Sequence, residues 1–457
     1  MEKQESKFLS VLKKTFKIDP SDFTWRSILV VVGTFMIGFV GLGIGNMAIS
    51  QFVNPLAEHF GVGRSTITLY TTFTKIAGMI TAIFFPEIYR KWGPKGLALF
   101  AGIPLALQFV IWSVATNLTM INIGSFIGGI GVQCAGGMMI LAIIRPWFKK
   151  NVGIFGALCG TASGLGGSIF TMRIASRIAE QGWQSGARMV AILVAVLIFI
   201  PFFLVKANDK DTMYIKTAKK LEAEAQAATK EGEKKKAIAP PLSYWEYMKV
   251  PSTWICIVLM FLTAGTTLPF MKAMNGVAAW KGFDGAVVGA AAFAAYSFWL
   301  SWSKIGMGIL RDLTGMKFCQ IFAWGTNILS MAAMLFIPNM SPGMFKFLAA
   351  INCFAGTATQ LGIGFMLIQS FGKYYNPRVY SLITIFFNIG RAIGEPLIQL
   401  PYDKWGTYAP TLWAMLIVGI LMLVLSMIAL NQGQKTIKKM DKIFTEKGYD
   451  ISQLDEA

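Results

Sequence analysis

The chain has 457 residues, of which 54% are hydrophobic and only 14% are charged. With a mean hydropathy of +0.55, this composition lies outside the range of soluble globular proteins and predicts a membrane protein. The formal net charge of +19 would suit a nucleic-acid-binding protein, but its distribution along the chain follows membrane topology. We therefore expect no nucleic-acid partner.

A basic segment at residues 1–27 opens the chain. It lacks the apolar core and the cleavage site of a signal peptide, so we expect a cytoplasmic N-terminal segment. Twelve apolar stretches of about 20 residues follow, each long enough to cross a bilayer as a helix. They lie at residues 28–50, 66–86, 97–116, 121–144, 152–174, 187–206, 252–271, 286–309, 318–337, 345–369, 379–400 and 409–430.

A polar, charged segment at residues 207–250 separates the first six stretches from the last six. It divides the chain into one six-helix bundle at residues 28–206 and a second at 251–431, and a polar tail at 432–457 follows. The sequence therefore predicts an all-α membrane protein with twelve transmembrane helices in two six-helix pseudo-repeats, joined by a cytoplasmic linker.

An internal repeat supports this division. An offset of 227 residues relates a GxxxQxxxG pattern in each half, in which Gly129, Gln133 and Gly137 correspond to Gly356, Gln360 and Gly364. The spacing places the glutamine between two glycines on one helix face, where glycine permits close packing. A second offset, of 222 residues, relates Gly93 to Gly315.

The distribution of basic residues predicts the orientation. Most of the 42 Lys and Arg fall in the two termini, the linker and the loops on the same side of the predicted membrane. This positive-inside bias places both termini and the linker in the cytoplasm. We expect a multi-pass, monomeric protein of the cell (inner or plasma) membrane, in contact with the lipid bilayer.

The cysteines give no sign of a disulfide or a metal site. All five lie in or at the edge of a predicted span and none forms a CxxC pair; they are Cys134, Cys159, Cys256, Cys319 and Cys353. The sequence also has no phosphate-binding loop and no catalytic triad. We therefore expect neither a cofactor nor an enzyme.

Two cations lie where a bilayer is driest, Lys304 within residues 290–309 and Arg391 within 379–400. An unpaired cation there costs from roughly 3 to more than 10 kcal/mol, so such a residue usually faces a wet pathway or a counter-charge. An anionic substrate would neutralise both, and Arg can bind two carboxylate oxygens. Two alternatives stay open: Arg391 pairs with Glu395 one turn away, and Lys304 extends to the cytoplasmic face.

Further polar residues lie within the predicted spans. Lys75, a third membrane cation, suits either substrate binding or a contact between helices. Glu395, the one acid away from a span terminus, suits either proton coupling or a static pairing with Arg391. Amide side chains are candidates for lining a substrate cavity or for hydrogen bonds between helices. They are Asn46, Gln51, Gln133, Gln360 and Asn388.

Two loops resemble the signature loop of the major facilitator superfamily, PEIYRKWGPK at residues 86–95 and GILRDLTGMK at 308–317. Leu313 stands where that family commonly has Arg, and Pro86 replaces an opening glycine. With the twelve spans and the repeat, the chain is similar to this family along nearly its whole length. The resemblance implies gating roles for Arg90, Gly93, Arg311, Asp312 and Gly315.

The eighth span resembles the oxalate/formate antiporter and monocarboxylate transporter branches, where a basic residue precedes a glycine by four positions, as Lys304 precedes Gly308. The oxalate carrier type also has a cation in its eleventh span, where this chain has Arg391. Leu300 stands where monocarboxylate transporters have an acid, which disfavours monocarboxylate–proton symport.

The resemblance implies a secondary transporter that moves a small organic anion, a mono- or dicarboxylate, by alternating access. We favour anion exchange over symport with protons. One alternative is a drug or neutral-solute carrier of the same superfamily, which would not depend on Lys304 or Arg391. Another, of a different class, is a membrane nutrient sensor that transports nothing.

Overall fold

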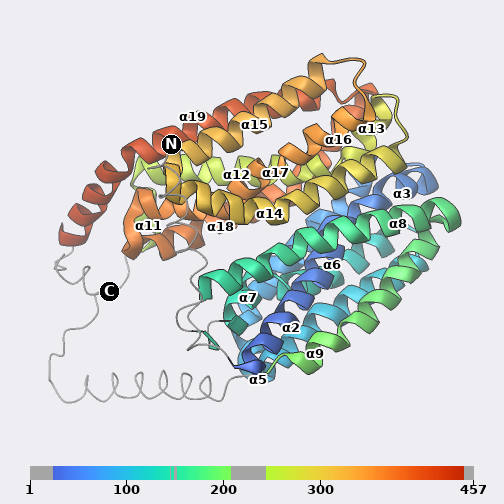
Figure 1. The fold of residues 1–457 in the computed structure, drawn as a ribbon, viewed down its shortest axis with the longest axis horizontal. Helices are drawn as coiled ribbons and strands as arrows, with labels where there is room; N and C mark the ends of the chain where they lie inside the picture. Colours follow the sequence, from blue (N-terminus) through green and yellow to red (C-terminus); the bar gives the residue numbers. More distant parts are fainter. Residues whose placement is uncertain (1–23, 145, 149–151, 207–242, 447–457) are drawn as a thin grey trace, which may run out of the picture.

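The computed structural model describes residues 24–144, 146–148, 152–206 and 243–446. Most of the predicted N-terminal segment and linker, and the end of the predicted tail, lie outside the described residues. Every regular element within them is helical. Figure 1 shows the elements up to α9 gathered in one bundle and those from α11 onward in a second.

The first bundle begins with α2, which continues into a π-helical turn and a 3-10 turn before α3. Its elements are α2 (Trp25–Leu42), the π-helical turn (Gly43–Met47), the 3-10 turn (Ala48–Phe52), α3 (Val53–Phe60), α4 (Arg64–Ile67), α5 (Leu69–Ser113), α6 (Leu118–Cys134), α7 (Gly137–Ile144), α8 (Val152–Leu197) and α9 (Phe199–Leu204).

The second bundle contains two further π-helical turns. Its elements are α11 (Tyr244–Met248), α12 (Pro251–Lys272), α13 (Met274–Trp280), a π-helical turn (Gly285–Gly289), α14 (Ala290–Thr314), α15 (Met316–Phe336), α16 (Pro342–Ile351), α17 (Cys353–Thr357), a π-helical turn (Ala358–Gly362), α18 (Ile363–Trp405) and α19 (Ala409–Glu446).

Glycines in a left-handed conformation divide the longest helices. Inside α5, α8 and α18 the backbone turns at Gly93 (φ 63°), Gly182 (φ 79°) and Gly372 (φ 76°). Gly315 (φ 87°) separates α14 from α15 in the same way. Only glycine adopts such φ values without strain. Gly93 and Gly315, which the sequence relates by its offset, thus form equivalent turns in the two loops with the family signature.

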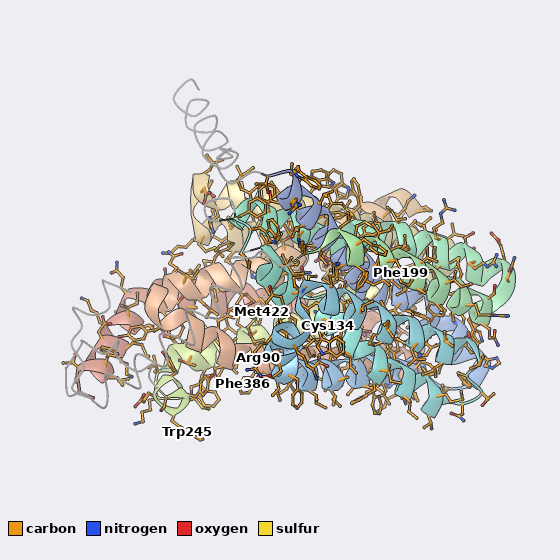
Figure 2. All side chains as sticks on the ribbon, turned by 90° about the horizontal axis from the view of Figure 1, so that it is seen from below. Arg90, Cys134, Phe199, Trp245, Phe386 and Met422 are labelled. Atoms are coloured by element: carbon orange, nitrogen blue, oxygen red, sulfur yellow. The ribbon has the colours of Figure 1, made fainter. Side chains whose placement is uncertain are left out.

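Nine helices among the described residues are long and apolar enough to cross a membrane. One of them, Ile154–Leu204, has 51 residues and turns at Gly182. At 1.5 Å per residue it is more than twice as long as a hydrocarbon layer of about 30 Å is thick, so it is long enough for two spans. The count of twelve spans stays a prediction. Large apolar side chains on the surface, such as Phe199 (55% exposed; Figure 2), fit a lipid environment.

Two predicted boundaries differ from the structure. The last helix does not end near residue 431 but continues to Glu446, where Phe444 is buried against Tyr375. The end of the predicted linker is packed as well, because α11 buries Tyr247 against Tyr375. Apolar residues of the linker and the tail therefore extend the core of the second half.

The repeat is visible in how helices cross. A Cβ atom on Gly129 would lie 2.4 Å from the carbonyl oxygen of Thr74, and one on Gly356 would lie 2.4 Å from the hydroxyl of Tyr296. The offset that relates Gly93 to Gly315 also relates Thr74 to Tyr296. Both glycines thus lie against the equivalent helix of their half, Gly129 in contact with its backbone and Gly356 with a side chain.

Candidate functional site

The first apolar stretch loses its regular helical form in the middle of the molecule. Asn46 lies on the π-helical turn and Gln51 on the 3-10 turn that follows, and both side chains are buried. Each contacts the other half: Asn46 Oδ1 accepts a hydrogen bond from Arg391 Nη2 (3.2 Å), and Gln51 Oε1 accepts one from Asn275 Nδ2 (2.8 Å). Interrupted helices of this kind are frequent at functional sites.

Arg391, on α18, lines a small cavity between helices of the second half. The cavity has a volume of about 10 Å³, roughly the space for one water molecule. Its other lining residues are Thr263, Ala264, Thr267, Leu268, Gly356, Thr359, Gln360 and Phe387. Arg391 and Gln360, which the sequence selects separately, thus share one cavity wall. The cavity must enlarge before an organic ligand can enter.

Glu395 is paired with a residue that the sequence analysis missed. Its Oε1 accepts from Lys272 Nζ at 2.5 Å, and its Oε2 accepts from Thr71 Oγ1 at 2.6 Å and from the Tyr70 hydroxyl at 3.4 Å. The pair is buried, with the Lys272 and Glu395 side chains 4% and 5% exposed. The ion-pair partner of Glu395 in this structure is thus Lys272, while Arg391 lies only within electrostatic range of Glu395. Glu395 joins α12 to α5 of the other half.

Lys272 follows the seventh predicted span, residues 252–271, by one residue, so the sequence places it outside the membrane. The chain continues from α12 into α13 through Ala273, and Lys272 stays inside the bundle. The apolar residues of the next segment, 273–280, were the available signal that the lysine is not at a surface.

Lys75 lies on α5, one turn after Thr71. Within the described part of the chain it forms no hydrogen bond or ion pair, but it lies within electrostatic range of Arg391, Lys272 and Glu395. This central cluster, which we define as Lys75, Lys272, Arg391 and Glu395, therefore holds three basic groups and one acidic group. With all four ionised it has a surplus of two positive charges, and that surplus attracts anions.

Lys304 occupies a separate place in the interface between the halves. Its Nζ donates to the carbonyl oxygen of Gly160 (2.7 Å) and lies 3.5 Å from Ser163 Oγ, both on α8. One turn earlier, Ser301 Oγ donates to the carbonyl oxygen of Thr161 (2.8 Å). Lys304 is 8% exposed, so it does not extend to an aqueous face in this structure. No contact joins it to Arg391 among the described residues.

The remaining predicted residues are dispersed. Gln133 lies beside Gly78, and Asn388 is partly buried on α18 without a hydrogen bond in the described part of the chain. In the signature loops, Arg90 pairs with Glu87 at 2.5 Å, and Arg311 pairs with its neighbour Asp312 at 2.7 Å. Arg311 also lines a second cavity together with Lys304.

A second group of polar residues, the distal cluster, joins the two halves. It lies at the end of the molecule opposite to Lys206, which precedes the predicted linker, and Ser243, which lies within it. Asp403 accepts hydrogen bonds from the backbone N–H groups of Arg64 (2.9 Å) and Ser65 (2.7 Å). The Arg64 side chain donates to the Tyr408 hydroxyl (3.1 Å), and its guanidinium lies 4.1 Å from the centroid of the Tyr402 ring.

Tyr408 links this contact back to the second half. Its hydroxyl donates to Gln399 Oε1 at 2.5 Å. Burial raises the pKa of Tyr408 to about 12, so the hydroxyl keeps the proton that it donates. The distal cluster therefore consists of Arg64, Ser65, Gln399, Tyr402, Asp403 and Tyr408. Sequence analysis did not find it, because its parts lie more than 330 residues apart.

The two helical halves, with interrupted helices at their interface, have the architecture of a secondary transporter. A sequence profile described as the Major Facilitator Superfamily matches residues 34–395, most of the chain. The chain belongs to the Major Facilitator Superfamily. It is therefore a multi-pass membrane protein of a transporter family, which is not a family of enzymes.

Similar proteins place the chain within this superfamily without fixing its branch. It is 24% identical over 157 residues to the uncharacterized MFS-type transporter YcxA of Bacillus subtilis (strain 168), covering 34% of this chain and 38% of that protein. It is 30% identical over 148 residues to the class H tetracycline resistance protein of Pasteurella multocida, covering 30% of this chain and 34% of that protein. The matches thus span little more than a third of the length of these curated relatives.

A solved structure is similar over nearly the whole fold. The crystal structure of the nucleoside transporter NupG (D323A mutant) matches with a TM-score of 0.68, covering 88% of this chain and 99% of that chain. The sequence identity is 10%, so this likeness shows the fold alone. The predicted all-α fold of the major facilitator type is confirmed, and the predicted branch stays a prediction.

Proposed function

We propose that this transporter carries a small organic anion, a mono- or dicarboxylate, by alternating access of its two halves. The observation that carries the proposal is the central cluster, in which Lys272 pairs with Glu395 and both Lys75 and Arg391 lie within electrostatic range of that carboxylate. With all four groups ionised, two cations inside the membrane protein lack a counter-charge, and a bound anion would offset the cost of burying them. A neutral solute would leave them unpaired.

Arg391 is the residue we propose to bind the carboxylate, because it lines the cavity and its guanidinium can donate to two oxygens at once. Asn46, which accepts from the same guanidinium, would orient it from the other half. Lys75 would add charge to the site. Lys304, held by the α8 carbonyl of Gly160 in this structure, would meet the substrate only after the halves move apart.

For coupling, we favour exchange of one anion for another over symport with a proton. Glu395 is the only acid in the central cluster, and Lys272, Thr71 and Tyr70 already occupy its oxygens. Its side chain is 5% exposed, so it has little access to water in this state. Symport through Glu395 is the alternative.

A second candidate is a carrier of drugs or neutral solutes. The 30% identity to a tetracycline resistance protein and the fold shared with a nucleoside transporter favour it more directly than they favour an anion carrier. The tetracycline resistance protein matches over only 34% of its length, and the nucleoside transporter is only 10% identical. The cations of the central cluster, by contrast, are residues of this chain itself. We therefore place the anion first.

Transport by purified protein in liposomes tests the proposal. We expect uptake of labelled mono- or dicarboxylates that requires an anion inside the liposomes and does not respond to an imposed pH gradient. Uptake of tetracycline or a nucleoside in place of carboxylates would support the second candidate. Carboxylate uptake into anion-free liposomes, driven by a pH gradient, would indicate symport, and no transport of any of these would indicate a sensor.

The orientation is a separate prediction, drawn from the positive-inside bias. A cysteine at Ala225, in the linker, should resist a membrane-impermeant thiol reagent in intact cells, because both termini and the linker are proposed to be cytoplasmic. A cysteine at Glu58, exposed on α3 at the distal end, should react. The five native cysteines are buried, so background labelling should be low. Labelling of the Ala225 position alone would reverse the orientation.

A further inference from the structure

Tyr296, on α14, carries a buried hydroxyl without a partner. The residue is 0% exposed, and its hydroxyl has no hydrogen bond within the described part of the chain. An unpaired buried hydroxyl destabilises a protein, and most such groups in native structures have partners. Its position in the bundle suggests what the missing partner is.

The hydroxyl adjoins the wall of the Arg391 cavity. It approaches Gly356, a lining residue of that cavity, so closely that a Cβ atom there would lie 2.4 Å from it. Tyr296 also lies within electrostatic range of the Arg391 guanidinium. Residue 356 is a glycine, so it adds no side chain of its own between the hydroxyl and this cavity, which Arg391 and Gln360 also line.

The equivalent position in the first half is fully bonded. The hydroxyl of Thr74, which the sequence offset relates to Tyr296, lies within hydrogen-bonding distance of two acceptors, the carbonyl oxygens of Tyr70 (2.9 Å) and Ser125 (3.2 Å). Other unpaired buried groups lie between packed helices instead: Ser297 faces Gly167 of α8, and Gln108 faces Gly128 of α6. Unlike these two groups, the Tyr296 hydroxyl adjoins a lining residue of the Arg391 cavity.

We propose that the Tyr296 hydroxyl donates a hydrogen bond to an oxygen of the anion that Arg391 binds, and that Tyr296 thereby determines specificity. The proposal rests on the anion-carrier function above. Arg391 takes both oxygens of one carboxylate, so Tyr296 takes a further oxygen close to it. The preferred substrates are carboxylates with a second oxygen acceptor next to the carboxylate, such as 2-oxo acids. An unsubstituted monocarboxylate would leave the hydroxyl unpaired and would therefore bind more weakly.

The test compares 2-oxopropanoate with propanoate, two monocarboxylates of equal carbon number, as competitors of uptake in liposomes. We expect the wild-type protein to prefer the 2-oxo acid by ~10-fold or more, the value of one good hydrogen bond. Tyr296→Phe should reduce this ratio to near one, mainly by weakening the binding of the 2-oxo acid. The melting temperature of ligand-free Tyr296→Phe should not fall, because no hydrogen bond is lost.

Tyr375→Phe is the matched control. Tyr375 is also buried (2% exposed), but its hydroxyl donates to Asp441 Oδ1 at 2.9 Å, away from the cavity. Its removal should lower the melting temperature and leave the selectivity unchanged. The opposite pattern in Tyr296→Phe, with a lower melting temperature and an unchanged ratio, would show a structural tyrosine and overturn the inference.

Arg391→Gln separates this inference from the function on which it rests. In one outcome, Arg391→Gln loses carboxylate binding, while Tyr296→Phe keeps the wild-type preference for the 2-oxo acid. That outcome would support the anion function and refute the role of Tyr296. Wild-type protein that binds neither acid, nor a dicarboxylate, would refute the anion function and the inference with it.

Discussion

Arg391→Gln is expected to abolish carboxylate uptake while the protein still folds and inserts. The change removes the donor that lines the cavity and leaves Asn46 without its partner from the other half. Loss of a charge-assisted contact in a dry site costs about 2–5 kcal/mol, or roughly 30-fold to several thousandfold in affinity. Uptake by liposomes, normalised to the amount of reconstituted protein, measures the effect.

Arg391→Lys should restore little of this activity, because an ammonium group lacks the planar fork that binds two oxygens. Arg188→Gln, at an exposed arginine on α8, is the matched control and should transport normally. Near-normal carboxylate uptake by Arg391→Gln would remove the main support for an anion carrier and favour a drug or neutral-solute carrier.

Lys272→Gln is expected to destabilise the protein more than the double change Lys272→Gln/Glu395→Gln. The single change leaves Glu395 as a buried, uncompensated charge, and breaking a buried ion pair in this way costs about 3–5 kcal/mol. The double change removes both charges and keeps groups that can hydrogen-bond to Thr71. Thermal unfolding of the purified proteins in detergent measures the difference.

Transport by the double variant then separates the two coupling modes. Under exchange, Glu395 is a structural partner, and anion counterflow should persist in the double variant. Under symport, acceleration by a pH gradient should be lost with Glu395. Glu87→Gln, which breaks the exposed pair with Arg90, should change stability by no more than ~1 kcal/mol. Equal instability of Lys272→Gln and the double variant would contradict the role given to the ion pair.

The sequence was sufficient for the helical fold because local composition determines it. A bilayer requires apolar runs of a given length, and left-handed turns require glycine, so the repeat of Gly93 at Gly315 located two loops. The cost of a cation in lipid likewise pointed to Arg391. These conclusions depend only on the chain within one span or one loop.

The partners of the polar residues could not be read from the sequence. Arg391 and Glu395 are neighbours on one helix, which favoured their pairing, but Lys272 reaches Glu395 from a helix 123 residues away. Lys304 bonds to a backbone carbonyl on α8, and any residue can supply such an acceptor. The first contact depends on how helices pack within the second bundle and the second on how the two bundles dock, and periodicity within a helix carries no information on either.

The distal cluster has a consequence for turnover. A carrier must occupy two arrangements of its halves in comparable amounts, so the contacts that hold one arrangement cannot be much stronger than those that hold the other. The distal cluster supplies such contacts. Asp403 accepts hydrogen bonds from two backbone N–H groups, and the Arg64 side chain contacts Tyr402 and Tyr408. Each contact stabilises this arrangement by about 1 kcal/mol. Since every additional 1.4 kcal/mol shifts the ratio of the two arrangements tenfold, reinforcement of this cluster would make a more stable protein and a slower transporter.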